Sequence, residues 1–143
     1  MTDNNITYLV PPGKIRCYVT GQLKNDTPEE HVRQRWARSL VDEYGYPKSD
    51  LGIEVKITMG RARKSADLVV FRQDTEHVQS EAYIIVEAKR ADKKPSDAQY
   101  GEEQLRSYIA ASSKCRFGLW VNQKRLAFER TLETGDIERI GDI

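Results

Sequence analysis

Two short apolar segments decide the fold: ADLVVF at residues 66–71 and AYIIVEAK at residues 82–89. Both are rich in β-branched and aromatic residues, and a polar stretch at 73–81 separates them. This pattern predicts two antiparallel strands joined by a long hairpin loop. We expect Phe71 to lie roughly opposite Ile84.

With that register, the start of the first strand meets the end of the second, so that Asp67 falls opposite Ala88. Side chains alternate between the two faces of a strand, so Glu87 and Lys89 point the same way. The hairpin is therefore expected to bring two acids and a base into one pocket.

Such a pocket has a specific chemical use. Two carboxylates can hold a divalent metal beside an activated water, and this is the minimum equipment of a metal-dependent nuclease. The alternative is structural: Asp67 is an exposed acid at a strand end, and Glu87 and Lys89 form a surface ion pair.

The composition indicates one domain spanning residues 1–143. The chain is 38% hydrophobic and 31% charged, which suffices for a single core. We expect residues 1–13 to be a loosely ordered lead, and the structure of residues 129–143 is left undecided. No apolar run reaches about 18 residues and no secretory leader follows Met1, so we expect a cytoplasmic protein without a membrane partner. Cys17 and Cys115 lack CxxC spacing, which favours reduced thiols over a zinc site.

Basic residues lie on both sides of the acidic centre. They are Arg61, Arg63 and Lys64 before Asp67, and Arg90, Lys93 and Lys94 after Lys89. A positive rim around an acidic centre suits a nucleic-acid backbone. The alternative is that these residues belong to solvated loops.

The remaining pattern predicts helices around the hairpin. A helix begins after Thr27, which is followed by Pro28 and, three residues after the cap, by Glu30; an apolar stripe then ends at Gly45. A second helix is expected from residue 96 or 97 to 111.

Further strands are predicted at residues 53–59, 117–121 and 126–128, and an edge strand at 14–19 precedes a turn at 21–26. The strand at 53–59 and the hairpin then form three antiparallel strands in sequence. This order implies an α/β fold with a central mixed sheet covered on both faces.

These residues carry a resemblance to a known superfamily. The order of Glu30, Asp67, the Glu87-Ala88-Lys89 motif and a QxxxY motif at residues 104–108 resembles the PD-(D/E)xK nucleases of the QxxxY branch. A closer resemblance is to the N-terminal nuclease domain of type I restriction enzyme R subunits. The blocks that carry it lie at residues 18–21, 27–34, 43–47, 63–67 and 85–90.

The resemblance implies a restriction-endonuclease-like, three-layer α-β-α fold and an endonuclease that hydrolyses DNA. Asp67, Glu87 and the Ala88 carbonyl would coordinate Mg²⁺, with Mn²⁺ as a substitute, because hard cations prefer oxygen ligands. Lys89 would orient the attacking water and stabilise charge.

Three further residues receive roles from the resemblance. Glu30 would support the metal site, although its position in a capping box explains it equally well. Gln104 would reach the catalytic site, and Tyr108 would combine contact with nucleic acid and a place in the core.

A type I R subunit also needs a motor that translocates DNA, but the Gly13-Lys14 pair lacks the upstream glycine of a P-loop. The chain is therefore expected to be either the nuclease part of a longer protein, with a motor domain or other restriction subunits as partners, or a stand-alone relative. An alternative function is a catalytically idle module that binds DNA or docks on other subunits.

Overall fold

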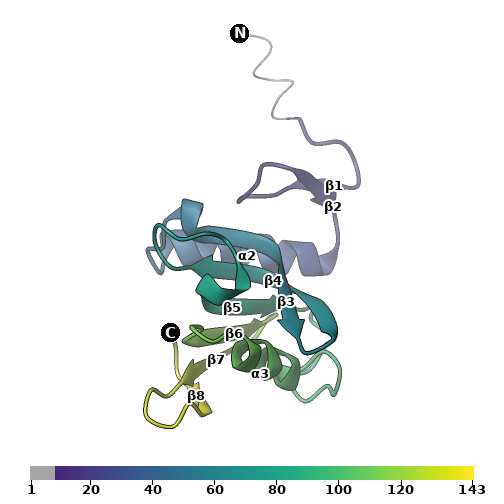
Figure 1. Ribbon diagram of the computed structural model, residues 1–143. Coiled ribbons are helices and arrows are strands. Elements are labelled where there is room, and N and C mark those ends of the chain that lie inside the picture. Colours follow the sequence, from purple (N-terminus) through teal and green to yellow (C-terminus); the bar gives the residue numbers. More distant parts are fainter. Residues whose placement is uncertain (1–8) are drawn as a thin grey trace.

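The computed structural model describes residues 9–143, which form a six-stranded mixed sheet with two helices (Figure 1). The strand order is β3-β4-β5-β6-β7-β8, and every neighbouring pair is antiparallel except β5 and β6, which are parallel. The strands are β3 (Leu51–Met59), β4 (Ala62–Phe71), β5 (Ala82–Ala88), β6 (Phe117–Val121), β7 (Arg125–Arg130) and β8 (Ile137–Ile140). The predicted mixed sheet, with its first three strands antiparallel, is confirmed.

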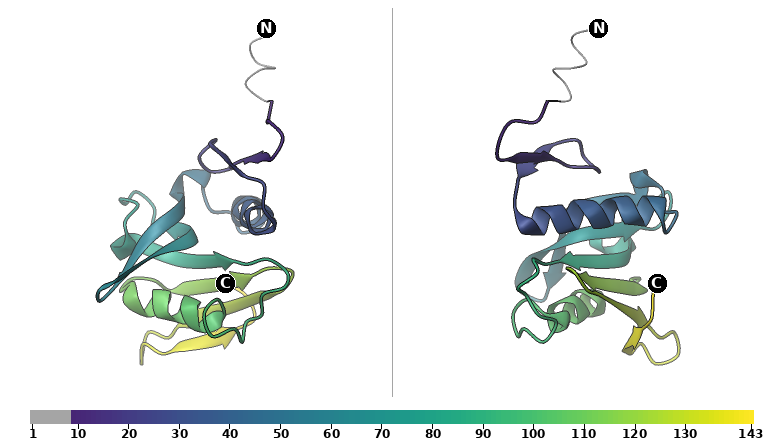
Figure 2. Two further views of the ribbon diagram at one scale, coloured as in Figure 1. Left: turned by 90° about the vertical axis from the view of Figure 1, so that its right-hand side faces the viewer. Right: turned by 180° about the vertical axis from the view of Figure 1, so that it is seen from behind.

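The two helices cover opposite faces of the sheet (Figure 2). On one face, α2 (Pro28–Asp42) buries Ala37 and Leu40 against apolar residues of the central strands. On the other, α3 (Glu102–Ala111) buries Leu105 and Ile109 in a second cluster. The arrangement is the predicted three-layer α-β-α architecture. Two short 3₁₀ turns, Lys48–Asp50 and Gln79–Glu81, precede β3 and β5.

Helix α2 begins and ends as the sequence predicts. The Thr27 hydroxyl accepts a hydrogen bond from the Glu30 amide at 3.1 Å, and Pro28 is the first helical residue. After the helix, Gly45 has φ of 82° and its amide bonds to the Val41 carbonyl at 3.2 Å. Glycine adopts this left-handed conformation without a steric penalty, so it ends the helix cleanly.

The buried stripe of α2 changes character along its length. Glu30, Arg33 and Gln34 are buried in the first turns, whereas Ala37 and Leu40 are buried further on. These five positions recur every three to four residues, so they lie on one face of the helix. The helix therefore presents a polar start and an apolar end to the sheet.

Helix α3 starts later than predicted, at Glu102 instead of residue 96 or 97. The Pro95 carbonyl accepts the Glu102 amide at 2.8 Å, and the Asp97 carbonyl accepts the Gly101 amide at 2.9 Å, so residues 95–101 close into a compact loop. A Cβ on Gly101 would lie 2.1 Å from the Pro95 carbonyl oxygen, which only glycine can avoid. Ala98, which falls within the predicted helix, lies outside the observed one and is exposed.

The N-terminal part also differs from the prediction. β1 (Lys14–Arg16) pairs with β2 (Leu23–Asn25) in a separate two-stranded ribbon, so β1 is not an edge strand of the main sheet. The predicted turn at residues 21–26 contains β2 because the chain reverses earlier, at Gly21, whose φ is 75°. Residues 9–13 are exposed, and the rest of the predicted lead lies outside the described residues.

The C-terminal residues form an ordered edge of the sheet. β8 pairs with β7, and beyond it the Asp142 carboxylate accepts a hydrogen bond from the Tyr44 hydroxyl at 2.7 Å. Cys17 and Cys115 are both buried and free. Within residues 9–143, no helix combines the length and the apolar character needed to cross a membrane.

Candidate metal and nucleic-acid site

The register of the β4–β5 hairpin places two acids side by side. Leu68 lies opposite Val86, and continuing this register by one residue sets Asp67 level with Glu87. The predicted register, with Asp67 opposite Ala88, was wrong by one residue. Residues directly opposite each other in an antiparallel pair project from the same face, so the observed register favours a shared acid site.

A bulge adds a further difference at the other end of the hairpin. The pairing slips between Val70 and Phe71, so that Phe71 lies opposite Ala82 while Val70 lies opposite Ile84. An irregularity of this kind inserts one unpaired residue and changes the register beyond it. The apolar pattern of the two strands contains no signal for it.

Asp67 lies within β4 and not at its start, because the strand already begins at Ala62. Backbone and side-chain bonds tie it to Glu87 near the end of β5. The Ala88 amide donates to Asp67 Oδ2 at 2.8 Å, and the Asp67 amide donates to Glu87 Oε1 at 3.3 Å. The ammonium of Lys89 lies 3.1 Å from Glu87 Oε2. Asp67, Glu87, Ala88 and Lys89 are therefore brought together, as the sequence predicts.

The carboxylate of Glu87 is the most constrained group of this site. Its residue is 1% exposed, and burial raises its pKa well above the usual range. The negative charge of Asp67 raises the pKa further, whereas Lys89 opposes the rise. A cation placed between the two acids would relieve both the burial and the repulsion.

Lys89 is fixed by its backbone as well as by its charge. Its amide donates to the Val121 carbonyl at 2.8 Å, which continues the β5–β6 pairing beyond the end of β5. The residue is buried, and its ammonium lies 5.6 Å from the centroid of the Tyr100 ring. Lys89 thus stands between Glu87 and an aromatic ring.

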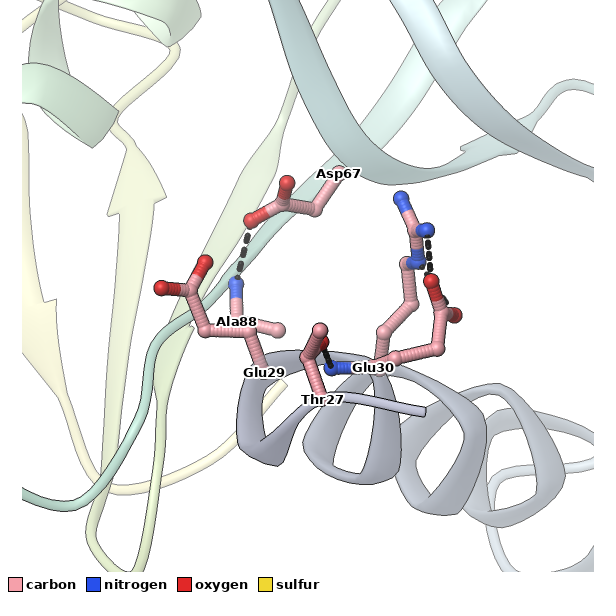
Figure 3. A pocket seen from close by; sticks show the side chains of 6 residues that line it. Thr27, Glu29, Glu30, Asp67 and Ala88 are labelled. Carbon is pink, nitrogen blue, oxygen red and sulfur yellow. Dashed lines mark hydrogen bonds and ion pairs between the residues drawn. The ribbon is translucent and has the colours of Figure 1, made fainter. Parts of the chain in front are cut away.

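Helix α2 adds a second group of polar residues on the other side of Asp67. A cavity of about 140 Å³ separates the start of α2 from the middle of β4 and the end of β5 (Figure 3). It is lined by Thr27, Glu29, Glu30, Arg33, Asp67 and Ala88. The fold thus brings Glu30 to the same pocket as Asp67, although the two residues lie in different layers.

The carboxylate of Glu30 is already bound by its own helix. Arg33 Nε donates to Glu30 Oε2 at 2.9 Å, a second guanidinium nitrogen binds Oε1, and Gln34 Nε2 donates to Oε2 at 2.7 Å. The capping explanation is therefore half right: Thr27 caps the helix, but the Glu30 side chain turns toward Arg33 and Gln34. Burial raises the pKa of Glu30, but the hydrogen bonds from these two residues outweigh it and the pKa is lowered.

Arg33 also reaches across to the sheet. Its Nη2 lies 3.2 Å from Glu54 Oε1, and Glu54 lies level with Asp67 in the β3–β4 register. Glu54 has φ of 52°, a left-handed conformation that is uncommon for residues with a Cβ. Sequence reasoning assigned no role to Arg33 or Glu54. The signal for Arg33 was its position one turn after Glu30 on the buried stripe.

The QxxxY motif approaches the acids from α3. Gln104 and Tyr108 line a cavity of about 300 Å³ together with Lys64 of β4. Burial raises the pKa of Tyr108 to about 12, the charges of Glu87 and Asp67 add to the rise, and a hydrogen bond from Gln104 opposes it. The hydroxyl of Tyr108 therefore experiences the field of both acids.

The predicted basic residues lie at different distances from the acids. Arg63 is four residues from Asp67 along β4, which corresponds to about 13 Å, and Arg61 lies beyond it in the β3–β4 turn. Arg90 pairs with Asp92 at 2.9 Å, and the ammonium of Lys93 lies 4.7 Å from the centroid of the Tyr100 ring. Lys94 is exposed on the same loop.

The donor set fits a hard divalent cation. Within the part of the chain that the structure describes, no three His, Cys, Asp or Glu side chains are grouped to hold a metal. The candidate ligands are two carboxylates, Asp67 and Glu87, and the Ala88 carbonyl at the same strand end. Oxygen donors of this kind suit Mg²⁺ or Mn²⁺, which keep several waters in their coordination shell.

A mixed sheet between two helices, with an acid pair where β4 and β5 meet, is consistent with a restriction-endonuclease-like α/β domain. Residues 28–143 match the family described as "Type I restriction enzyme R protein N terminus (HSDR_N)", and the chain belongs to this family. The matched region begins with α2 and includes both helices and all six strands of the main sheet. No curated protein and no solved structure matches the chain. The resemblance drawn from the sequence blocks is thereby confirmed.

Proposed function

We propose that this chain is a metal-dependent endonuclease domain that hydrolyses phosphodiester bonds of DNA. It would act as the nuclease part of a type I restriction R subunit or as a stand-alone relative. The observation that carries the proposal is the pair of half-buried Asp67 and buried Glu87, with the Lys89 ammonium 3.1 Å from Glu87, in a member of this restriction family.

Asp67, Glu87 and the Ala88 carbonyl would hold Mg²⁺, with Mn²⁺ as a substitute. When bound, the ion would lower the pKa of a water ligand and offset charge that develops on the phosphate. Without it, burial and repulsion disfavour two adjacent negative charges, and this explains why the acids suit a cation.

Lys89 would position the attacking water and stabilise negative charge. Its ammonium has three donors, and one of them is directed to Glu87 at 3.1 Å. A neighbouring donor can therefore hold a water close to the acid pair. Gln104 and Tyr108 would contact the nucleic acid from α3, and Lys64 would meet its backbone across the shared cavity.

Glu30 would act on the site through Arg33. Because Arg33 and Gln34 already occupy its carboxylate, Glu30 holds the Arg33 guanidinium in place at the wall of the cavity that Asp67 lines. The more distant basic residues would steer DNA by long-range attraction. They are Arg61, Arg63, Arg90, Lys93 and Lys94.

The engagement of Glu30 also favours the second candidate, a catalytically idle module that binds DNA or docks on a motor domain or other restriction subunits. A supporting acid that is fully bound by its own helix is not free to ligate a metal. This candidate predicts salt-sensitive DNA binding without cleavage.

Nicking of supercoiled plasmid separates the two candidates. We expect cleavage by the wild-type chain in Mg²⁺ or Mn²⁺, none in EDTA, and a loss of about a thousandfold in Glu87→Gln, because the metal contributes several kcal/mol to the transition state. Glu76→Gln is the matched control, since Glu76 is exposed in the loop at the other end of the hairpin. DNA binding without nicking in either ion supports the idle module, and nicking that survives Glu87→Gln excludes the proposed metal site.

A further inference from the structure

Tyr100 presents an exposed aromatic ring beside the acid pair. It lies on the loop between β5 and α3 and is 37% exposed, which makes it one of few exposed large hydrophobic side chains among residues 9–143. The ammonium of Lys93 lies 4.7 Å from the ring centroid and that of Lys89 lies 5.6 Å from it. An exposed ring flanked by cations is typical of surfaces that bind nucleic-acid strands.

The core of the protein fixes the position of this ring. The indole nitrogen of buried Trp120 donates to the Tyr100 carbonyl at 3.0 Å. Asn122, which is also buried, donates from Nδ2 to the Lys93 carbonyl at 2.9 Å and to the Arg90 carbonyl at 3.3 Å. The backbone of the loop is therefore held by the buried side chains of Trp120 and Asn122.

The ring borders the cavity that contains the QxxxY motif. Tyr100, Lys64, Gln104 and Tyr108 all line this space of about 300 Å³. The Oε1 atom of Gln104 is buried and has no hydrogen-bond partner among the described residues. A buried acceptor without a partner is costly, so a donor supplied by a ligand would satisfy it.

We propose that Tyr100 is a stacking platform for an unpaired base of the DNA strand, with the Gln104 amide facing the edge of that base. A base inside a duplex stacks on its neighbours and cannot cover a protein ring, so the platform selects a single-stranded or locally opened segment. On binding, the flexible stem of Lys93 swings its ammonium group from the ring to a flanking phosphate, while Lys89 keeps its contact with Glu87. The inference rests on the proposed nuclease function for its choice of DNA as the ligand.

Lys89 links the platform to the acid pair. The same ammonium lies 3.1 Å from Glu87 and 5.6 Å from the Tyr100 centroid. A base on the ring therefore belongs to a nucleotide close to the phosphate that the acid pair would engage. The inference narrows the substrate to DNA that is unpaired next to the cleavage position.

Binding of oligonucleotides in EDTA tests the platform without any cleavage. We compare a single strand carrying 2-aminopurine with a blunt duplex of the same sequence. For Tyr100→Ala we expect affinity for the single strand to fall about 5- to 100-fold, the contribution of one stacked base, while duplex affinity changes by less than about twofold. Tyr100→Phe keeps the ring and should stay within about twofold of the wild type.

Two further variants act as controls. Tyr83→Ala removes a tyrosine that also lies under a cation, with the Arg72 guanidinium 5.2 Å from its ring, but at the opposite end of β5, and it should leave DNA affinity unchanged. Lys93→Ala should lower the slope of log affinity against log salt by about 0.7, the value for one phosphate contact on a single strand. Thermal melting of every variant checks that the fold is kept.

Three results would overturn the inference: unchanged single-strand affinity in Tyr100→Ala, an equal loss in Tyr100→Phe, or an equal loss for the duplex. None of them depends on catalysis. Plasmid nicking that survives Glu87→Gln would remove the proposed nuclease site while leaving the binding result intact. The two proposals therefore fail separately.

Discussion

Two buried glutamates, one on α2 and one on β5, show opposite shifts of their pKa values. Glu30 is 6% exposed and Glu87 is 1% exposed, and burial alone raises the pKa of both. The pKa of Glu30 is nevertheless lowered, whereas that of Glu87 is raised well above its usual range. Glu87 is the more deeply buried of the two, and the two residues also differ in their partners.

The charge and the hydrogen-bonding oxygens of Glu30, the α2 glutamate, are satisfied by neighbouring side chains. Arg33 and Gln34 supply hydrogen bonds to both carboxylate oxygens, and the guanidinium adds a full positive charge. The β5 glutamate has one ammonium, Lys89, and a second carboxylate, Asp67, beside it. A buried acid with its own cation is structural, and a buried acid that still lacks charge compensation is poised to receive a ligand.

Removing Arg33, the charge partner of Glu30, should have the largest effect on stability. Arg33→Met keeps an unbranched stem but leaves Glu30 buried without its charge partner. We expect the free energy of unfolding at pH 7 to fall by about 3–5 kcal/mol in urea denaturation. Arg61→Met, at an exposed arginine in the β3–β4 turn, is the control and should cost less than about 1 kcal/mol. Equal losses in the two variants would contradict the pairing.

Adding a divalent cation that binds beside Glu87 should have the next largest effect on stability. At a Mg²⁺ or Mn²⁺ concentration of about 100 times the dissociation constant, the wild-type chain should gain about 2.7 kcal/mol by linkage. Glu87→Gln removes a ligand charge and should lose most of this gain, whereas Glu30→Gln should keep it. Differential scanning calorimetry with and without the ion measures both. A gain that is the same in all three proteins would place the ion elsewhere.

Neutralising Glu30 should destabilise the protein in a pH-dependent way. We expect Glu30→Gln to cost about 2 kcal/mol at pH 7, since charged hydrogen bonds to Arg33 and Gln34 become neutral ones. A lowered folded-state pKa contributes stability above the unfolded value of about 4.3, and this contribution disappears as pH falls through the folded-state pKa. The difference from the wild type should therefore shrink below about pH 4. A cost that is constant from pH 7 to pH 3 would show that the charge is not the cause.

Neutralising Glu87 should have the smallest effect on stability, and it should stabilise the protein instead of destabilising it. For a raised folded-state pKa, the stabilising contribution is present below the unfolded value of about 4.3 and is lost as pH rises. In metal-free buffer, Glu87→Gln should therefore melt above the wild type at pH 7 and close to it below about pH 4. The gain is small because the amide also gives up the attraction to Lys89. A lower melting temperature at pH 7 would contradict the assignment.

The sequence was informative wherever local chemistry alone determines the structure. Thr27 and Pro28 start α2, Gly45 ends it, and the apolar runs of β4 and β5 form the hairpin that joins Asp67 to Glu87. Family blocks on either side of this hairpin identified the class of domain, which the match over residues 28–143 confirms.

The features that sequence reasoning missed depend on contacts between distant segments. The bulge between Val70 and Phe71 arises from pairing, and the late start of α3 arises from the closure of Pro95 on Glu102. The polar residues at the start of the buried α2 stripe do not contribute to an apolar periodicity. The apolar pattern of the sequence therefore did not predict that they are buried. Arg33 and Gln34 are buried because Glu30 accompanies them, and spacing without coordinates shows no such pairing.

Asn122 keeps the backbone of the β5–α3 loop ordered, and this should affect the rate at which a strand binds. Its side-chain amide spans two carbonyls of the loop, and the Lys93 and Gly101 amides are themselves bonded to carbonyls within it. These amide hydrogens should exchange slowly with solvent although the loop is basic and lies at the surface. Because the backbone is ordered before any ligand arrives, its ordering entropy is not lost on binding. Capture of a strand should then be limited by diffusional encounter and ionic strength instead of by slow loop closure.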